Sequence, residues 1–210
     1  MIIGVNMFAL VESGTITQFP KGNKGITIGD NQYPKTIYSL WTEAERNAIG
    51  IYTVEIDNTN KKDEAFYINT DVTYTFTGSA VTGSYGTATA KKLADEDAVD
   101  ENGDKVKDAD GNQVINYGLK TKYKNQFNAQ AAGLLAKTDW YVIKATDVDS
   151  YSVPSNITTY RAAVRTKVNA METSIDNCSD VEALITLLTY TEQEDGSVTR
   201  PLGEFPKEVV

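Results

Sequence analysis

Few residues in this chain could carry out chemistry. Histidine is absent from all 210 residues, and Cys178 is the single cysteine. Without histidine, neither a Ser-His-Asp nor a Cys-His nucleophile can be assembled, and a catalytic zinc site lacks its usual ligand. Cys178 stands just before an expected helix, where the helix N-terminus can lower a thiol pKa, but no histidine base accompanies it. Paired carboxylates, as in glycosidases, remain open as a catalytic chemistry.

Phosphate-binding and redox motifs are missing as well. The sequence contains no Gly-x-x-x-x-Gly-Lys-Ser/Thr loop, no Gly-x-Gly-x-x-Gly fingerprint and no Cys-x-x-Cys pair. We therefore expect no catalytic residue, no cofactor and no metal, and a protein that is not an enzyme.

Acidic side chains concentrate in residues 94–116, which contain a short internal repeat. DENGDKV, starting at Asp100, is followed by DADGNQV, starting at Asp108. Each unit has an Asn-Gly or Asp-Gly turn signal, which predicts a protruding β-hairpin or meander. The alternative is calcium, but an EF-hand loop needs an oxygen ligand at position 1, five residues before its glycine. Ala98 and Val106 occupy those positions, so the template fails and at most a weak cation site is left.

Charge and hydropathy limit the partners. The formal net charge of −9 argues against a nucleic-acid backbone as the main partner, because phosphate contacts need a basic surface. No apolar run approaches the length needed to cross a bilayer, so we expect no membrane insertion. The first residues lack the basic region and cleavage site of a signal peptide, which predicts synthesis in the cytoplasm without export.

Two segments of residues 117–190 have strong helical periodicity. Their apolar residues are Leu119, Tyr123, Phe127, Ala131 and Leu134 in the first, and Tyr160, Val164, Val168, Met171 and Ile175 in the second. Steps of three and four residues place each set on one helical face. The first helix should end near Ala136, and the second should follow Pro154 with Ser155 or Asn156 as its cap. These segments predict a helical hairpin.

A turn and a third helix complete this module. Thr138-Asp139-Trp140 is expected to form the turn, with Trp140 packed between the helices and its N–H bonded. A capping box of Ser179 and Glu182 predicts a short third helix. The expected hairpin core is Trp140, Tyr160, Leu134, Val164 and Met171.

A hairpin this thin should leave apolar surface exposed, and such surface usually marks a binding site. We expect a wet rim of basic residues around it: Lys120, Lys122, Lys124, Arg161 and Arg165. The interface candidates are Trp140, Tyr160, Arg161, Arg165, Lys120 and Lys124.

Residues 1–92 predict short strands around one short helix. Strand-like runs at 7–12 and 15–19 flank a Ser13-Gly14 turn, and a loop is expected at 30–34. A helix over 42–49 is predicted by a capping box of Thr42 and Glu45. Further strands are expected at 51–56, 65–69, 72–77 and 81–90, spaced like an antiparallel meander with one buried and one wet face.

These patterns predict an α+β chain: an N-terminal, mainly antiparallel β module followed by a C-terminal α-helical hairpin with a short third helix. The expected parts are the β-rich module at 1–92, the acidic insert at 93–116, the helical module at 117–190 and an extended tail at 191–210 lying on a neighbour.

Three stretches together resemble a family of tailed-bacteriophage proteins. They are MFALVESGTITQFPKG near the start, LWTEAERNAIGIYTVEIDNTN with YINT, and AAGLLAKTDWYVIKA with VPSNITTYRAAVRTKVNAMETSI. The pattern is similar to the small accessory proteins of phage tail fibres, including tail-fibre and fibre-assembly proteins. Thr138-Asp139-Trp140 together with Tyr160-Arg161 is its most specific part. The acidic insert and the C-terminal tail lie outside it.

The resemblance implies a non-enzymatic structural protein of the virion, at the tail, baseplate or fibre attachment. Its partners would be other tail or fibre subunits, with a homo-oligomer within the particle. A tail-fibre assembly chaperone and a host-surface binding module are the alternatives.

Overall fold

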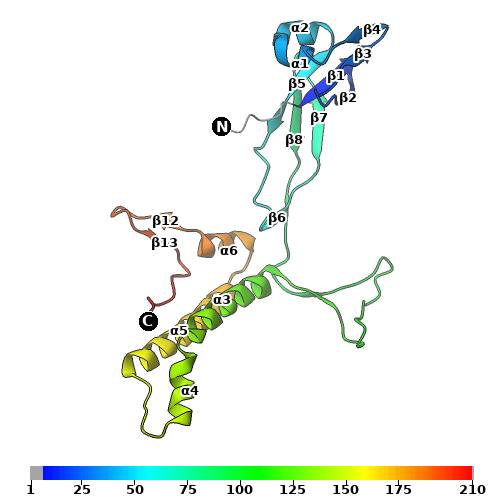
Figure 1. Cartoon of the computed structure of the whole chain (residues 1–210). Helices are drawn as coiled ribbons and strands as arrows, with labels where there is room; N and C mark the ends of the chain where they lie inside the picture. The colour runs from blue at the N-terminus through cyan, green and yellow to red at the C-terminus, as the bar shows by residue number, and fades with distance from the viewer. Residues whose placement is uncertain (1–6, 210) are drawn as a thin grey trace. The chain divides into compact units, whose positions relative to one another are not determined.

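The computed structural model describes residues 7–209, which form two compact units that meet between Thr89 and Ala90 (Figure 1). The first unit is built from strands with two short helices, and the second from four helices and two small hairpins. The predicted α+β class is confirmed, with the β-rich region first and the packed helices after it.

Five strands of the first unit form a mixed sheet. They are β1 (Phe8–Glu12), β2 (Thr15–Gln18), β5 (Ile51–Asp57), β7 (Val72–Phe76) and β8 (Val81–Tyr85). Their spatial order is β2-β1-β5-β8-β7. The edge strands β2 and β7 approach each other, and the rings of Phe19 and Tyr74 lie 4.6 Å apart, so the sheet curls into a nearly closed barrel.

The predicted meander is wrong at one pairing. β5 and β8 run parallel, with Val54 opposite Val81, whereas the other neighbours are antiparallel. A parallel pair cannot be joined by a tight turn, so the chain makes a long connection from β5 before it returns. That connection includes β6 (Tyr67–Ile68), which pairs with β9 (Thr89–Ala90), and β7 on the far side of β8.

Both faces of β1 are buried, against the expectation of one wet face. Phe8 and Leu10 join one apolar cluster with Ile37 and Ile51, while Ala9 and Val11 join a second cluster inside the curled sheet. Successive side chains of a strand point to opposite faces, so β1 contributes to both clusters, and β5 does the same through Ile51 and Val54.

Two short helices and a small hairpin accompany the sheet. They are α1 (Ile37–Leu40), α2 (Glu43–Ala48), β3 (Ile26–Ile28) and β4 (Asn31–Tyr33). The capping box of α2 is confirmed: the Glu45 amide donates to Thr42 Oγ1 at 3.3 Å, and the Thr42 amide donates to Glu45 Oε2 at 2.8 Å. The loop expected at 30–34 is instead the turn and second strand of the β3–β4 hairpin.

The acidic insert is organised by a ring of three backbone hydrogen bonds. Ala98 donates to Val114 at 2.8 Å, Val114 donates to Val106 at 3.0 Å, and Val106 donates to Ala98 at 2.9 Å. These residues are eight positions apart, so the repeat unit becomes a structural unit. In each unit, the carboxylate of one aspartate stabilises the turn by accepting hydrogen bonds from two backbone amides. This aspartate is Asp100 in the first unit and Asp108 in the second. The paired strands β10 (Glu96–Asp97) and β11 (Ile115–Asn116) form the base.

The second unit contains α3 (Leu119–Ala136), α4 (Asp139–Asp147), α5 (Ser155–Asp176) and α6 (Val181–Leu188). α3 packs on α5 as a hairpin, as predicted (Figure 1). The predicted face of α5 is confirmed, since Tyr160, Val164, Val168, Met171 and Ile175 are all buried. On α3, Leu119, Phe127 and Ala131 are buried, whereas Tyr123 and Leu134 are half-buried.

Two predicted helix caps are wrong. α5 follows Pro154 without a side-chain cap. α6 is capped by Asp180 rather than Ser179, because Asp180 is the extended residue directly before the first turn and its Oδ1 accepts the Ala183 amide at 2.8 Å. Ser179 donates to Asp180 Oδ2 instead.

The tail is not simply extended. β12 (Thr191–Glu192) and β13 (Val198–Thr199) form a hairpin, and Leu202 beyond it is buried. The Leu202 amide donates to the Leu187 carbonyl at 3.1 Å, and Lys167 Nζ donates to the Leu202 carbonyl at 2.7 Å. The tail thus docks on the helices of its own chain. Over residues 7–209, no helix combines the length and the apolar character that a bilayer crossing requires.

Candidate functional site

A buried arginine joins three helices of the second unit. Arg161 on α5 is only 9% exposed. Its Nη1 donates to the Leu135 carbonyl at 2.8 Å and to Thr138 Oγ1 at 2.6 Å, and its Nη2 lies 2.8 Å from Asp139 Oδ1. Thr138 is fully buried, and its hydroxyl donates to the Leu135 carbonyl at 2.9 Å. We call Arg161, Leu135, Thr138 and Asp139 the arginine junction.

The arginine junction fixes where α3 ends and α4 begins. The guanidinium donates to the Leu135 carbonyl in the last turn of α3, which also accepts the amide and the hydroxyl of Thr138. It also holds Asp139, the first residue of α4. A helix N-terminus favours a carboxylate, so Asp139 suits this position. The junction therefore sets the direction of α4.

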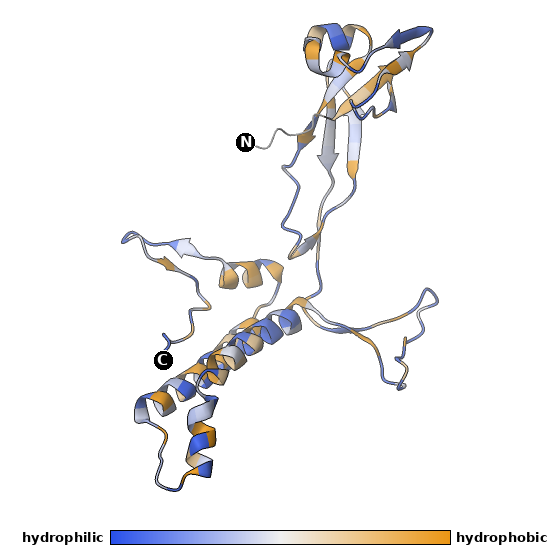
Figure 2. Ribbon diagram, viewed as in Figure 1, coloured by the Kyte–Doolittle hydropathy of each residue, from blue (hydrophilic) through white to orange (hydrophobic). Residues whose placement is uncertain are grey.

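α4 leaves several large apolar side chains exposed among the described residues. Its exposed large side chains, with Val148 directly after it, are Trp140 at 51%, Val142 at 41%, Ile143 at 60% and Val148 at 40%. None of its nine residues is buried. Figure 2 shows the hydrophobic positions along this short helix. Trp140 and Ile143 are three positions apart and lie about 60° from each other around the helix, whereas Val142 lies about 160° from Trp140. We call Trp140 and Ile143 the α4 face.

Aromatic and cationic contacts hold part of the α4 face in place. The Trp140 and Tyr141 rings lie with their centroids 4.0 Å apart. Lys144 Nζ lies 4.4 Å from the centroid of the Tyr151 ring and 5.7 Å from that of Trp140. Lys144 thereby connects α4 to the loop after it, and cation–π contacts of this kind favour a defined ring orientation.

Two predictions about this region are wrong. Trp140 is not in the hairpin core, because Asp139 starts a new helix instead of a turn and that helix presents Trp140 to solvent. Arg161 is not on a wet rim, because three oxygen acceptors across the hairpin hold its guanidinium inside.

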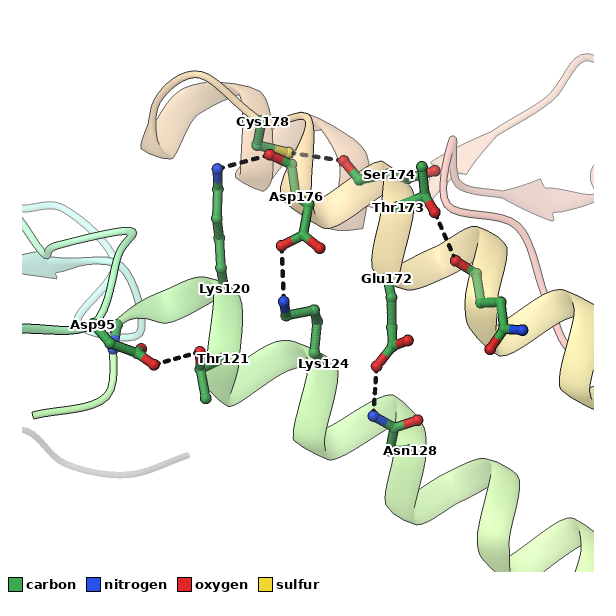
Figure 3. Close-up of polar contacts among 12 residues, drawn as sticks. Asp95, Lys120, Thr121, Lys124, Asn128, Glu172, Thr173, Ser174, Asp176 and Cys178 are labelled. Atoms are coloured by element: carbon green, nitrogen blue, oxygen red, sulfur yellow. Dashed lines mark hydrogen bonds and ion pairs between the residues drawn. The ribbon is translucent and has the colours of Figure 1, made fainter. Parts of the chain in front are cut away.

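The two lysine candidates fasten the other end of the hairpin. Lys120 Nζ donates to the Asp176 carbonyl, and Lys124 Nζ pairs with Asp176 Oδ1, both at 2.8 Å (Figure 3). The hydrogen bond to Asp176 raises the pKa of Lys124. Asn128 donates to Glu172 at 2.6 Å one turn further along. These side chains connect α3 to α5.

The remaining candidates lie apart from the α4 face. Tyr160 is buried, its hydroxyl has no hydrogen-bond partner among the described residues, and burial raises its pKa. Arg165 is exposed, with a 3.4 Å bond to the Arg161 carbonyl. Of the six candidates, Arg161 belongs to the arginine junction, and Trp140 directly follows Asp139, another of its members.

Cys178 is poorly suited to nucleophilic chemistry. The thiol is buried, Sγ lies 3.5 Å from the Ser174 carbonyl, and burial raises the pKa of Cys178 (Figure 3). A raised pKa lowers the fraction of reactive thiolate. Within residues 7–209, no three His, Cys, Asp or Glu side chains gather closely enough to hold a metal ion.

Sequence reasoning missed α4 and the arginine junction. Tyr141, Val142, Ile143 and Val148 gave a compositional signal for an apolar segment, but their spacing did not separate a buried face from an exposed one. The motif that pairs Thr138-Asp139-Trp140 with Tyr160-Arg161 did contain the junction's polar side chains. No family model, curated protein or solved structure matches this chain significantly.

Proposed function

We propose that this protein is a non-enzymatic structural component of a tailed-bacteriophage virion, at the tail, baseplate or tail-fibre attachment. It would be made in the host cytoplasm and act in the particle through protein–protein interfaces. The sequence motifs that resemble phage tail-fibre accessory proteins support this proposal, and the most specific of them coincides with the arginine junction.

The observation that carries the proposal is the α4 face. A nine-residue helix is marginal in water, since isolated helices of that length rarely form. Here the arginine junction anchors one end, while Trp140 and Ile143 remain more than half exposed. Tryptophan and tyrosine are enriched in protein interfaces. A short helix that is anchored yet exposes its largest side chains is well suited to contact another subunit.

The partner of the α4 face would be another tail or fibre subunit, or a second copy of this chain. Subunits of one kind usually close by symmetry, and a two-fold contact places the same face on both copies. A few side chains near the centre of such a contact carry most of its binding energy, and tryptophan is among the most frequent of them.

Mass spectrometry of purified virions tests the proposal. Recovery at a fixed stoichiometry to other tail proteins is expected. Absence from the particle, together with association with the fibre in infected cells, would favour the alternative of an assembly chaperone and contradict a structural role.

A double variant, Trp140→Ala with Ile143→Ser, tests the α4 face. The control variant is Asp147→Ala on the same helix. The double variant should enter particles at least tenfold less efficiently, since truncating each central interface side chain costs about 1–2 kcal/mol. The control should enter normally. Normal incorporation of a folded double variant would place the attachment surface elsewhere.

A further inference from the structure

A polar pocket of about 380 Å³ lies in the first unit, where the loop after β2 faces Tyr38 of α1. Its walls combine two ammonium groups, two amides and two aromatic rings: Lys21, Lys24, Gln18, Asn23, Phe19 and Tyr38. This volume is within the range of small-molecule sites.

The charge of the pocket is opposite to that of the chain. The formal net charge is −9, yet the pocket is lined by two lysines and by no aspartate or glutamate. Over residues 7–209, neither lysine side chain has an ion pair or hydrogen bond with another residue. Because both ammonium groups line one pocket and no carboxylate does, the pocket favours an anion.

Packing fixes the two aromatic walls of the pocket and the loop backbone at Gly25, whereas the two lysines and the asparagine are exposed. The Phe19 ring lies on Tyr74, and the Tyr38 ring lies 4.9 Å from that of Phe8, which belongs to a buried apolar cluster. A Cβ atom at Gly25 would lie 2.5 Å from the Tyr33 carbonyl oxygen, so the loop approaches β4 more closely than a larger residue allows. A site that is already formed pays little ordering entropy when a ligand binds.

We propose that this pocket binds an anionic sugar, with a carboxylate or phosphate group between Lys21 and Lys24. Lysine binds either group as a point charge. The amides of Gln18 and Asn23 can each donate to and accept from sugar hydroxyls. The rings of Phe19 and Tyr38 offer apolar surface to the sugar ring. This inference is independent of the α4 face, which belongs to the other unit.

The test is a titration of the full chain, labelled with ¹⁵N, at low ionic strength. The probes are galacturonic acid, glucose 6-phosphate and, as neutral matches, galactose and glucose. Saturable shifts are expected for amides of residues 18–26 and Tyr38 with at least one acid, and weak or no shifts with the neutral sugars. Saturation by galacturonic acid alone identifies a carboxylate site, and saturation by glucose 6-phosphate alone identifies a phosphate site.

Charge variants make the test specific. Lys21→Ala and Lys24→Ala should each weaken binding about fivefold, and the double variant at least tenfold, as expected for partly solvated charge pairs. Lys35→Ala removes the same charge from the same unit outside the pocket and should change affinity less than about twofold. Spectra that superpose outside residues 18–26 will show that each variant is folded. The proposal is overturned if no acid gives saturable shifts at the pocket, or if Lys35→Ala weakens binding as much as the pocket variants.

Discussion

Replacing Arg161 with methionine tests the arginine junction. Methionine keeps much of the side-chain length but cannot donate to the Leu135 carbonyl, to Thr138 Oγ1 or to Asp139. Each bond from the charged guanidinium to a neutral oxygen contributes about 1.5–3 kcal/mol. The Asp139 side chain is 53% exposed, so that ion pair adds at most about 1 kcal/mol.

Two effects reduce the net loss. The Leu135 carbonyl keeps the Thr138 amide and hydroxyl as donors, so it is not left unpaired. Methionine also removes the cost of burying a charge. We therefore expect Arg161→Met to lower the free energy of unfolding by about 2–3 kcal/mol.

The matched control is Arg165→Met, one turn further along α5 and exposed, which should change stability by less than about 0.5 kcal/mol. Urea unfolding followed by circular dichroism gives both values. Hydrogen exchange should show the amides of 139–147 opening more often in Arg161→Met, because α4 buries no residue of its own. If the two variants agree within 0.5 kcal/mol and α4 exchanges equally in both, the junction does not hold α4.

Three further outcomes are expected. Trp140→Ala should lower the free energy of unfolding in urea by less than about 1 kcal/mol, because half of the Trp140 side chain is already exposed to solvent. A decrease of about 3 kcal/mol or more would show that Trp140 is a core residue. Val164→Ala, at a fully buried position, should cost about 1–3 kcal/mol in the same assay, and a neutral result would contradict the α3–α5 packing. Hydrogen bonds from the amides of Asn112 and Asp110 hold the pKa of Asp108 below its ordinary value of 3.8. The ionised carboxylate therefore stabilises this turn fully above pH 3.8, and the stabilisation is lost as the pH falls through the lower pKa of the folded state. In an NMR titration from about pH 6 to about pH 2, the amide chemical shifts of residues 110 and 112 should therefore follow this lowered pKa. In the control variant Asp108→Asn, the same shifts should not change with the ionisation of residue 108.

Much of the fold was predictable because its signals are local. The apolar face of α5 follows from residue spacing, since a helix places every third or fourth side chain on one side. The capping box of α2 needs residues three positions apart and nothing else. The Asn-Gly and Asp-Gly turns of the acidic insert are similarly self-contained, although the ring formed by Ala98, Val106 and Val114 depends on how the two repeat units fold back on each other.

Tertiary structure decided what depends on distant partners. The parallel pairing of β5 with β8 depends on which strands become neighbours in the folded sheet, and the residue composition of a strand does not predict its neighbour. Arg161 has the charge of a surface residue, yet it is buried because Leu135 and Thr138, 26 and 23 positions earlier, supply acceptors inside the protein. Trp140 has the large apolar side chain of a core residue, yet it is half exposed because α4 begins at Asp139, which Arg161 holds, and places Trp140 toward solvent. In both cases the side chain's own chemistry indicated one environment, and contacts across the hairpin selected the other.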